Sequence, residues 1–225
     1  MKKSKIQQGK TLLITSLYHF KKNATPNYTY YFFIINLRPF NLNFRGMENI
    51  KVLDREFTPY IDHETIVSKI KEMAQKMDND LRGKNPLFLG ILNGSFMFAA
   101  ELFNHLTIDC NISFLKLASY QGTNTTGNVK RLIGLNEDIK DRTVVIVEDI
   151  IDTGITMDHI EKQLIGYEPK EIKIATLLYK SEVYNNKYPI DYFCFDIPQK
   201  FIVGFGLDYD GFGRNLPHIY QEIKK

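Results

Sequence analysis

The run Val144–Thr156, VVIVEDIIDTGIT, constrains the fold more than any other part of the chain. Its first four residues, Val144–Val147, are all apolar, as is typical of a central parallel strand that is buried on both faces. Glu148 and Asp149 follow directly, at the carboxyl end of that strand, where open α/β sheets bind their ligands. The run therefore predicts a polar binding site at the edge of a buried parallel sheet.

The second half of the run has the composition of a phosphate site. Asp152, Thr153 and Gly154 lead into Thr156, which we expect near the start of a helix. Free N–H groups at a helix start, hydroxyl groups and a glycine that permits close approach together suit phosphate. The carboxylates beside it would repel a phosphate unless they bond sugar hydroxyls or a Mg²⁺ ion. The whole run indicates a site for a phosphorylated sugar with a divalent metal, whereas an isolated Asp-Thr-Gly would indicate only a capped helix.

Apolar patterns on both sides of this run predict strands that alternate with helices. Such alternation indicates an α/β fold, with an open, mainly parallel sheet and helices on both faces. The expected strands are 87–92, 112–117, 143–147, 172–178, 192–195 and 201–203, and the expected helices are one capped by Asp62, 96–106 and 156–165.

The charge of the chain is unevenly distributed. Residues 1–46 hold eight of the 29 Lys and Arg residues and no acid, so residues 47–225 carry 21 basic against 26 acidic residues. A mildly acidic body disfavours nucleic acid as a partner. We expect 1–46 to be an atypical basic leader outside the fold and 47–225 to form one domain. No apolar run approaches the roughly 20 residues of a membrane helix, and Cys110 and Cys194 predict buried free thiols in a reducing cytoplasm.

Two common phosphate-binding motifs are absent from the sequence. There is no Gly-x-x-x-x-Gly-Lys-Ser/Thr, and Gly204-Phe205-Gly206 lacks the third glycine of a dinucleotide fingerprint, because Tyr209 stands there. The run 144–156 instead resembles the phosphoribosyl-pyrophosphate signature of the type I phosphoribosyltransferases, specifically the hypoxanthine-guanine phosphoribosyltransferases. The segments 90–96, 116–120, 178–180 and 200–214 agree with that family in the same order, so the resemblance covers about 50–220 and implies a small hood beside the parallel sheet.

In that family the turn after the first strand binds pyrophosphate through backbone N–H groups beside a non-proline cis peptide. The resemblance assigns this role to Leu92, Asn93, Gly94 and Ser95, with the cis peptide between Leu92 and Asn93, and adds Arg214 as a further pyrophosphate contact. Many relatives carry Lys where this chain has Asn93. No side-chain charge on pyrophosphate is therefore expected from that position.

Around the phosphorylated sugar, the resemblance implies that Glu148 and Asp149 hold the ribose hydroxyls. Together with Asp208 they would also hold the Mg²⁺ cofactor. Asp152 would act as general base and acid at purine N7. The implied contacts to the 5′-phosphate are Thr153, Gly154 and Thr156.

The resemblance also implies a pocket for the purine. Lys180 would donate to the 6-oxygen of the base, Phe201 would stack on it, and Ile202 would contribute backbone groups. Ser119 and Tyr120 would begin a lid that closes over the site. The polar loop after them, rich in Gly, Thr and Asn, independently suits a segment of low local stability.

The implied function is purine salvage. The chain would transfer the phosphoribosyl group of phosphoribosyl pyrophosphate to N9 of hypoxanthine or guanine, giving IMP or GMP and pyrophosphate. Two alternatives stay open: a non-catalytic regulator that senses phosphoribosyl pyrophosphate on the same fold, and the same reaction on another base such as xanthine. The family further implies a homo-dimer or homo-tetramer in the cytoplasm that binds small molecules, with no nucleic acid or membrane partner.

Deleting residues 1–46 tests the domain boundary. Every motif lies beyond Met47, so a chain that begins there should unfold at the same temperature as the full chain and turn over at the same rate. Thermal unfolding and steady-state kinetics of the two proteins check this. A loss of stability or of activity on truncation would show that residues 1–46 belong to the domain.

Overall fold

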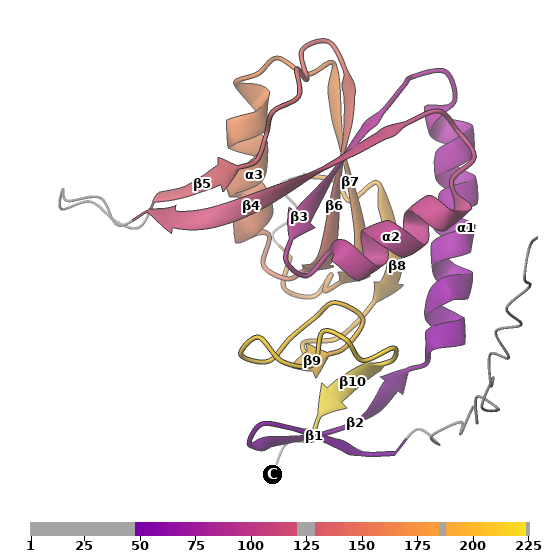
Figure 1. Cartoon of the computed structure of the whole chain (residues 1–225), viewed down its shortest axis with the longest axis vertical. Coiled ribbons are helices and arrows are strands. Elements are labelled where there is room, and N and C mark those ends of the chain that lie inside the picture. Colours follow the sequence, from indigo (N-terminus) through magenta and orange to yellow (C-terminus); the bar gives the residue numbers. More distant parts are fainter. Residues whose placement is uncertain (1–47, 121–128, 185–187, 224–225) are drawn as a thin grey trace, which may run out of the picture. The chain divides into compact units, whose positions relative to one another are not determined.

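The computed structural model of the chain describes residues 48–120, 129–184 and 188–223, with the backbone alone for 118–120 and 129–133. These residues belong to one unit built from two sheets and three helices. In Figure 1 the larger sheet and its helices form the upper body, and the smaller sheet, which we call the hood, lies below them.

The larger sheet has six strands in the order β5-β4-β3-β6-β7-β8. All neighbours pair in parallel except β4 and β5, which are antiparallel. The predicted α/β fold with an open, mainly parallel sheet is therefore confirmed. The strands are β3 (Leu87–Leu92), β4 (Asn111–Tyr120), β5 (Val129–Ile133), β6 (Thr143–Ile151), β7 (Glu171–Tyr179) and β8 (Tyr192–Asp196).

Alternate residues of β6 point into two separate cores. Val145 and Val147 pack with α1 (His63–Leu81) and α2 (Phe96–His105), whereas Val144 and Ile146 pack with α3 (Ile155–Ile165). Figure 1 accordingly shows α3 on one side of the sheet and α1 and α2 on the other. Because successive strand residues face opposite ways, an unbroken apolar run is what a strand between two helical layers requires.

The start and end of α1 follow from local chemistry. Asp62 caps it, since its Oδ1 accepts a hydrogen bond from the Thr65 backbone N–H at 2.8 Å. The helix ends at Leu81, and Gly83 adopts a φ of 74°, which a residue with a side chain rarely adopts. The apolar residues that recur at helical spacing along α1 are all buried: Ile66, Ile70, Met73, Met77 and Leu81.

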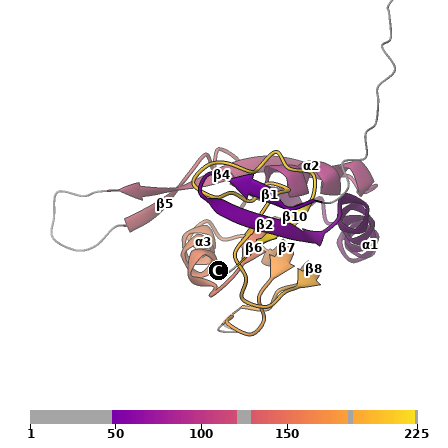
Figure 2. The same cartoon turned by 90° about the horizontal axis from the view of Figure 1, so that it is seen from below.

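The hood joins segments from both ends of the described chain. It pairs β1 (Ile50–Val52) and β2 (Arg55–Ile61) with β10 (Ile219–Glu222) and β9 (Ile202–Val203), antiparallel throughout, in the order β1-β2-β10-β9. Seen from below in Figure 2, these strands lie across the end of the larger sheet. Four hood residues share one apolar core with α1 and α2: Ile202, Phe205, Leu207 and Ile219. The hood is therefore packed against the body of the molecule.

The structure differs from the sequence predictions in three respects. Strands β1, β2, β5 and β10 were not predicted. Strand β6 continues past Val147 to Ile151, because Glu148 and Ile150 still pair with β7. Cys110 and Cys194 are free, as predicted, but both are only partly buried. Within the described residues no helix is both long and apolar enough to cross a membrane.

Replacing Asp78 of α1 should destabilise the fold, because its carboxylate organises the segment after α2. It is 7% exposed and accepts hydrogen bonds from Thr107 N–H at 3.0 Å, Thr107 Oγ1 at 2.6 Å and Ile108 N–H at 3.3 Å. We expect Asp78→Ala to lower the free energy of unfolding by about 3 kcal/mol, since the hydrogen bonds to this buried, charged acceptor are lost together. Urea denaturation measures it. The control is Glu72→Ala on the same helix, whose exposed ion pair with Lys69 should contribute about 0.5 kcal/mol or less.

Candidate active site

Two adjacent carboxylates, Glu148 and Asp149, lie near the carboxyl end of β6, where burial disfavours their ionised form. Glu148 is 8% exposed, and its Oε2 accepts no hydrogen bond from the residues that the structure describes. Burial, and after it the neighbouring Asp149, raises the pKa of Glu148 well above its usual value. Burial also raises the pKa of Asp149 to about 6, although backbone N–H groups and Arg214 oppose the rise. Such a pair suits a ligand that brings a cation or hydroxyl donors.

The turn between β3 and α2 runs directly against Asp149. Its Leu92–Asn93 peptide is cis, as the resemblance implied. A Cβ built on Gly94 would lie 1.7 Å from Asp149 Oδ2, so any side chain there would displace this carboxylate. Ser95 begins α2, and its fully buried Oγ has no hydrogen-bond partner within the described part of the chain. The turn thus presents backbone and an unpaired hydroxyl beside the carboxylates.

A hood loop packs against the other side of this turn. A Cβ on Gly206, whose φ is +101°, would lie 2.1 Å from the Gly94 carbonyl oxygen. Arg214 Nη1 donates to the Gly206 carbonyl at 2.7 Å and holds that loop in place. Gly94 therefore lies between Asp149 on one side and Gly206 on the other, in close contact with both.

Arg214 and Asp208 form an ion pair that acts on Asp149. Arg214 Nη2 lies 2.6 Å from Asp208 Oδ1, and Asp208 Oδ2 accepts a hydrogen bond from Gly211 N–H at 2.6 Å. Both charges act on Asp149, since Arg214 lowers its pKa and Asp208 raises it. The hood thus contributes charged groups to the site that the sheet alone would lack.

The start of α3, where the sequence predicts a phosphate site, carries no side-chain cap among the described residues. Gly154 is the N-cap of this helix, with a φ of 84°. Its first N–H groups are therefore available to an anion. Residues 148–157, which include Thr153 and Thr156, line a cavity of about 250 Å³.

Asp152 and Lys180 meet across adjacent strands. Lys180 Nζ donates to Asp152 Oδ2 at 2.8 Å, and the Lys180 side chain is only 8% exposed. The backbone N–H of Lys180 bonds the Ile151 carbonyl at 3.0 Å, which fixes it beside the end of β6. Asp152 Oδ1 is buried and has no hydrogen-bond partner among the described residues. One oxygen of this carboxylate is thus held by the ammonium and the other is left for a ligand.

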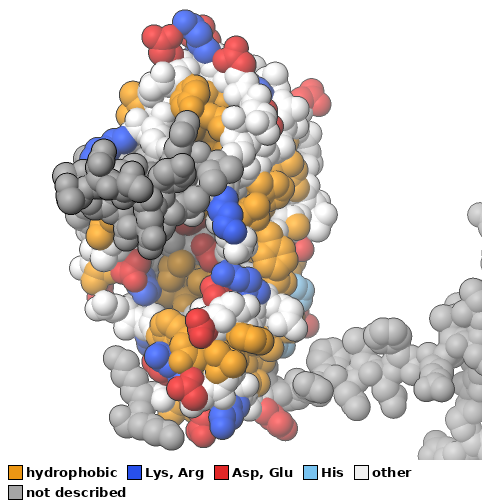
Figure 3. Space-filling view, turned by 60° about the vertical axis from the view of Figure 1, so that its left-hand side comes forward, with side chains coloured by type: hydrophobic (Ala, Val, Ile, Leu, Met, Phe, Trp, Pro, Cys, Tyr) orange, Lys and Arg blue, Asp and Glu red, His pale blue; other side chains and the backbone are white. Residues whose placement is uncertain are grey.

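The remaining predicted site residues lie in the hood and at the end of β4. Phe201 is 38% exposed beside β9, and Ile202 is 5% exposed within it. Ser119 and Tyr120 end β4, where their backbone pairs with Lys130 and Val129; their side chains and the loop 121–128 lie outside the described residues. Figure 3 shows a hollow between hood and body with acidic side chains in it.

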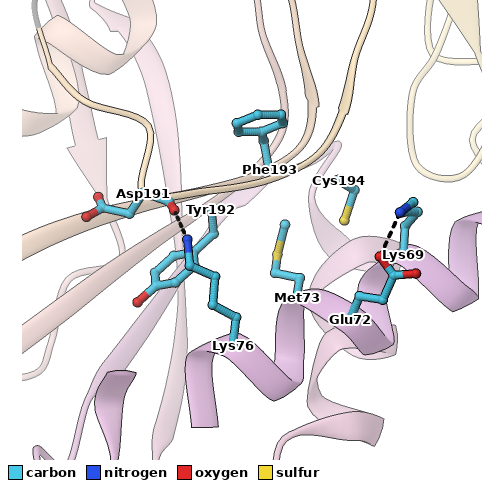
Figure 4. A pocket seen from close by; sticks show the side chains of 8 residues that line it. All are labelled: Lys69, Glu72, Met73, Lys76, Asp191, Tyr192, Phe193 and Cys194. Carbon is cyan, nitrogen blue, oxygen red and sulfur yellow. Dashed lines mark hydrogen bonds and ion pairs between the residues drawn. The ribbon is translucent and has the colours of Figure 1, made fainter. Parts of the chain in front are cut away.

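A second hollow, of about 300 Å³, lies between α1 and β8 (Figure 4). Its charged groups are already paired, with Lys69 2.6 Å from Glu72 and Lys76 donating to the Asp191 carbonyl at 3.0 Å. Burial raises the pKa of the Cys194 thiol to about 12, so it is not a nucleophile at neutral pH. This hollow lies at the amino end of β8, away from the carboxyl ends of the parallel strands, and has no groups suited to the predicted chemistry.

Sequence reasoning missed Gly206 and Arg55 as residues that shape the site. Gly204-Phe205-Gly206 was considered only as a failed dinucleotide motif, yet its second glycine allows the hood to touch Gly94. Arg55 packs on the Phe201 ring, with its Cζ 5.1 Å from the ring centroid. No local pattern around Arg55 indicates this contact, because its partners are far away in sequence.

Comparison with known proteins agrees with this geometry. Residues 58–210 match the family model of the phosphoribosyl transferase domain, and the chain belongs to that family. A hypoxanthine-guanine phosphoribosyltransferase of Streptococcus agalactiae is 43% identical over 157 residues, which cover 69% of this chain and 87% of the relative. One from Lactococcus lactis is 42% identical over 160 residues, with 71% and 87% covered.

Solved structures give the same result. A hypoxanthine-guanine phosphoribosyltransferase of Bacillus anthracis superposes with a TM-score of 0.66 at 34% identity, covering 73% of this chain and 96% of that one. A hypoxanthine phosphoribosyltransferase of Staphylococcus aureus gives 0.67 at 32% identity, covering 73% and 90%. The resemblance seen in the sequence, to the hypoxanthine-guanine phosphoribosyltransferases, is confirmed.

Gly94→Ala should impair the site without unfolding the protein. The added Cβ would displace the Asp149 carboxylate, and misplacing a site group by about 1 Å can lower turnover about 10²-fold. Steady-state kinetics measure this. The control is Gly166→Ala, where φ is −63° and the nearest atom would lie at an ordinary 3.4 Å. Native turnover by Gly94→Ala would mean that Asp149 need not stay where the structure has it.

Proposed function

We propose that this chain transfers the phosphoribosyl group of phosphoribosyl pyrophosphate to N9 of hypoxanthine or guanine, giving IMP or GMP and pyrophosphate. The observation that carries the proposal is the Lys180–Asp152 pair, which lies beside the α3 cradle. A 6-oxopurine places an oxygen and N7 along one edge of the ring. An ammonium and a carboxylate 2.8 Å apart can address these two positions together.

The sugar and its phosphates have matching groups. The free N–H groups at the start of α3, with Thr153, Gly154 and Thr156, would bind the 5′-phosphate. Hydroxyl donors of the ribose would supply the hydrogen bond that Glu148 Oε2 lacks and would add to the backbone hydrogen bonds of Asp149. The turn Leu92–Ser95 and Arg214 would bind the pyrophosphate, the turn by backbone N–H groups. This arrangement positions the ribose between its leaving group and the base.

Mg²⁺ fits the donors present. Among the described residues no three His, Cys, Asp or Glu side chains gather as a metal cluster. Mg²⁺, however, is usually held by one or two carboxylates, with phosphate oxygens and water completing its shell. Glu148 and Asp149 would supply those carboxylates, with Asp208 as a further ligand. Bound there, the metal would offset the negative charge that develops on departing pyrophosphate.

Asp152 would act as the general base and acid for the purine. Its free oxygen would accept a proton at N7 or return it, while Lys180 holds the other oxygen in place. Phe201 would cover the ring, Ile202 would add backbone groups, and Ser119 and Tyr120 would lead into the lid. A site closed in this way excludes water, which would otherwise capture the ribosyl centre.

We further infer that 47–225 form the working domain, as a dimer or tetramer in the cytoplasm.

Measuring nucleotide formation tests the proposal. Purified protein is incubated with phosphoribosyl pyrophosphate, Mg²⁺ and each of hypoxanthine, guanine, xanthine and adenine, with a chelator as the negative control. Formation of IMP or GMP that stops on chelation supports the proposal. Binding of phosphoribosyl pyrophosphate with no product from any base would instead identify a regulator on this fold.

Lys180→Met should weaken base selection and also slow turnover. The Lys180 ammonium can only donate hydrogen bonds, so it pairs with a 6-oxygen. The amino group of adenine at the same position is also a donor, so the two groups cannot form a hydrogen bond. A site built on such a hydrogen bond can reject the mismatched base by up to about 10⁴-fold. The variant should have a lower kcat/KM for hypoxanthine, and the difference in kcat/KM between hypoxanthine and adenine should become smaller. Because the same ammonium holds Asp152, kcat should fall as well as the affinity for base.

The comparison uses kcat/KM on both bases, before and after the substitution. Lys140→Met is the control, since Lys140 forms an exposed ion pair with Glu168. Unchanged discrimination in Lys180→Met would shift the role of base reader to backbone groups near Ile202.

A further inference from the structure

A charged and aromatic cluster in the hood surrounds Phe201. The guanidinium of Arg55 lies over two rings at once, with its Cζ 5.1 Å from the Phe201 centroid and 4.4 Å from the Tyr209 centroid. The two rings are 5.7 Å apart and nearly perpendicular, at 89°. The cation thus occupies the corner between them, where both ring faces attract it.

The members of this cluster are fixed by further hydrogen bonds. Glu222 Oε1 pairs with Arg55 Nη1 at 2.9 Å, and the Glu222 backbone N–H donates to the Phe201 carbonyl at 2.8 Å. Tyr209 donates its hydroxyl to Asp54 Oδ1 at 2.8 Å. Glu222 therefore holds both the backbone of Phe201 and the arginine on its ring. Three separate segments of the chain converge on one aromatic side chain.

We infer that Arg55 is a positioning residue for the purine, acting through Phe201. The inference rests on the proposed function, in which the base stacks on Phe201. A flat ring has two faces, and the guanidinium lies over one of them. The Phe57 ring also packs beside Phe201, at 6.2 Å between centroids, so a base can stack only on the part of the 38% exposed ring that Arg55 and Phe57 leave uncovered. The cation fixes the ring and draws its electrons toward itself, which strengthens stacking of an electron-rich oxopurine.

A purely structural role for Arg55 makes a different prediction. The ion pair with Glu222 links β2 to β10, and Arg55 could act only by joining these strands. Loss of that link would loosen the hood as a whole, including the loop that carries Arg214. Stability and the KM for phosphoribosyl pyrophosphate would then change together with the KM for the base. Positioning of Phe201 affects the base alone.

The test measures both KM values for Arg55→Gln. We expect the KM for hypoxanthine to rise about two- to fivefold, the equivalent of one cation–π contact, with the KM for phosphoribosyl pyrophosphate unchanged. Arg55→Lys keeps a cation and should lie between the variant and the native enzyme. The matched control is Arg82→Gln, which should be unchanged. It lies at the far end of α1, roughly 28 Å along the 19-residue helix from the hood.

A double substitution makes the test specific to the ring. In a Phe201→Leu background, Arg55→Gln should raise the KM for hypoxanthine no further, because the surface on which the arginine acts is gone. An unchanged hypoxanthine KM in Arg55→Gln alone, an equal rise for both substrates, or an undiminished effect in the double variant would each overturn the inference. Failure of the proposed function is distinct from these outcomes, because the native protein would then form no nucleotide at all.

Discussion

The burial of ionisable carboxylates at the end of β6 is the constraint on which the rest of the site depends. Folding raises the pKa of Asp149 from 3.8 to about 6, so the protein's stability falls as the pH rises across that interval and stays lowered above it. At neutral pH the ionised group costs about 3 kcal/mol, at about 1.4 kcal/mol per pKa unit. Glu148 beside it is shifted in the same direction. A ligand that supplies hydroxyl donors or a cation relieves this cost, so the fold itself favours such a ligand.

The hood belongs to the site because of how closely it approaches these carboxylates. Gly206 lets the hood backbone pack on the backbone of Gly94, and Gly94 leaves room for the Asp149 carboxylate on its other side. The contact brings Arg214, the cation that opposes the pKa rise of Asp149, into range. The hood strands come from both ends of the described chain, so the position of Arg214 depends on the pairing of these two ends. The site is consequently a product of the whole domain, although its densest motif is a single run.

The sequence could predict the elements that depend on local interactions, and it could not predict those that depend on contacts between residues far apart in the chain. The strand β3, the helix α1 and the run 144–156 carry local signals, namely apolar runs, periodicity and a capping Asp62, and the structure agrees with them. Strands β2 and β10 pair across a separation of about 160 residues, and β2 contains Pro59, so neither shows a local strand pattern. Asp208 and Arg214 could be assigned only by resemblance. The role of Arg55 could not be predicted, because its contacts arise only from the pairing of strands in the hood.

In the proposed function, the Lys180–Asp152 pair would link recognition of the base to transfer of its proton. The two side chains come from the ends of neighbouring parallel strands, so strand pairing sets their separation and leaves little freedom to adjust one alone. Asp152 has one oxygen committed to Lys180 and one unpaired, and Lys180 keeps further N–H donors for a ligand. In the proposed reaction, a base with an oxygen at position six would complete this arrangement, because it would accept from the lysine while N7 meets the unpaired carboxylate oxygen. A base with an amino group there would leave the lysine without an acceptor and would lose the alignment at N7 as well. On this proposal, selectivity for oxopurines and proton transfer depend on the same ion pair, so a substitution that relaxes one should also disturb the other.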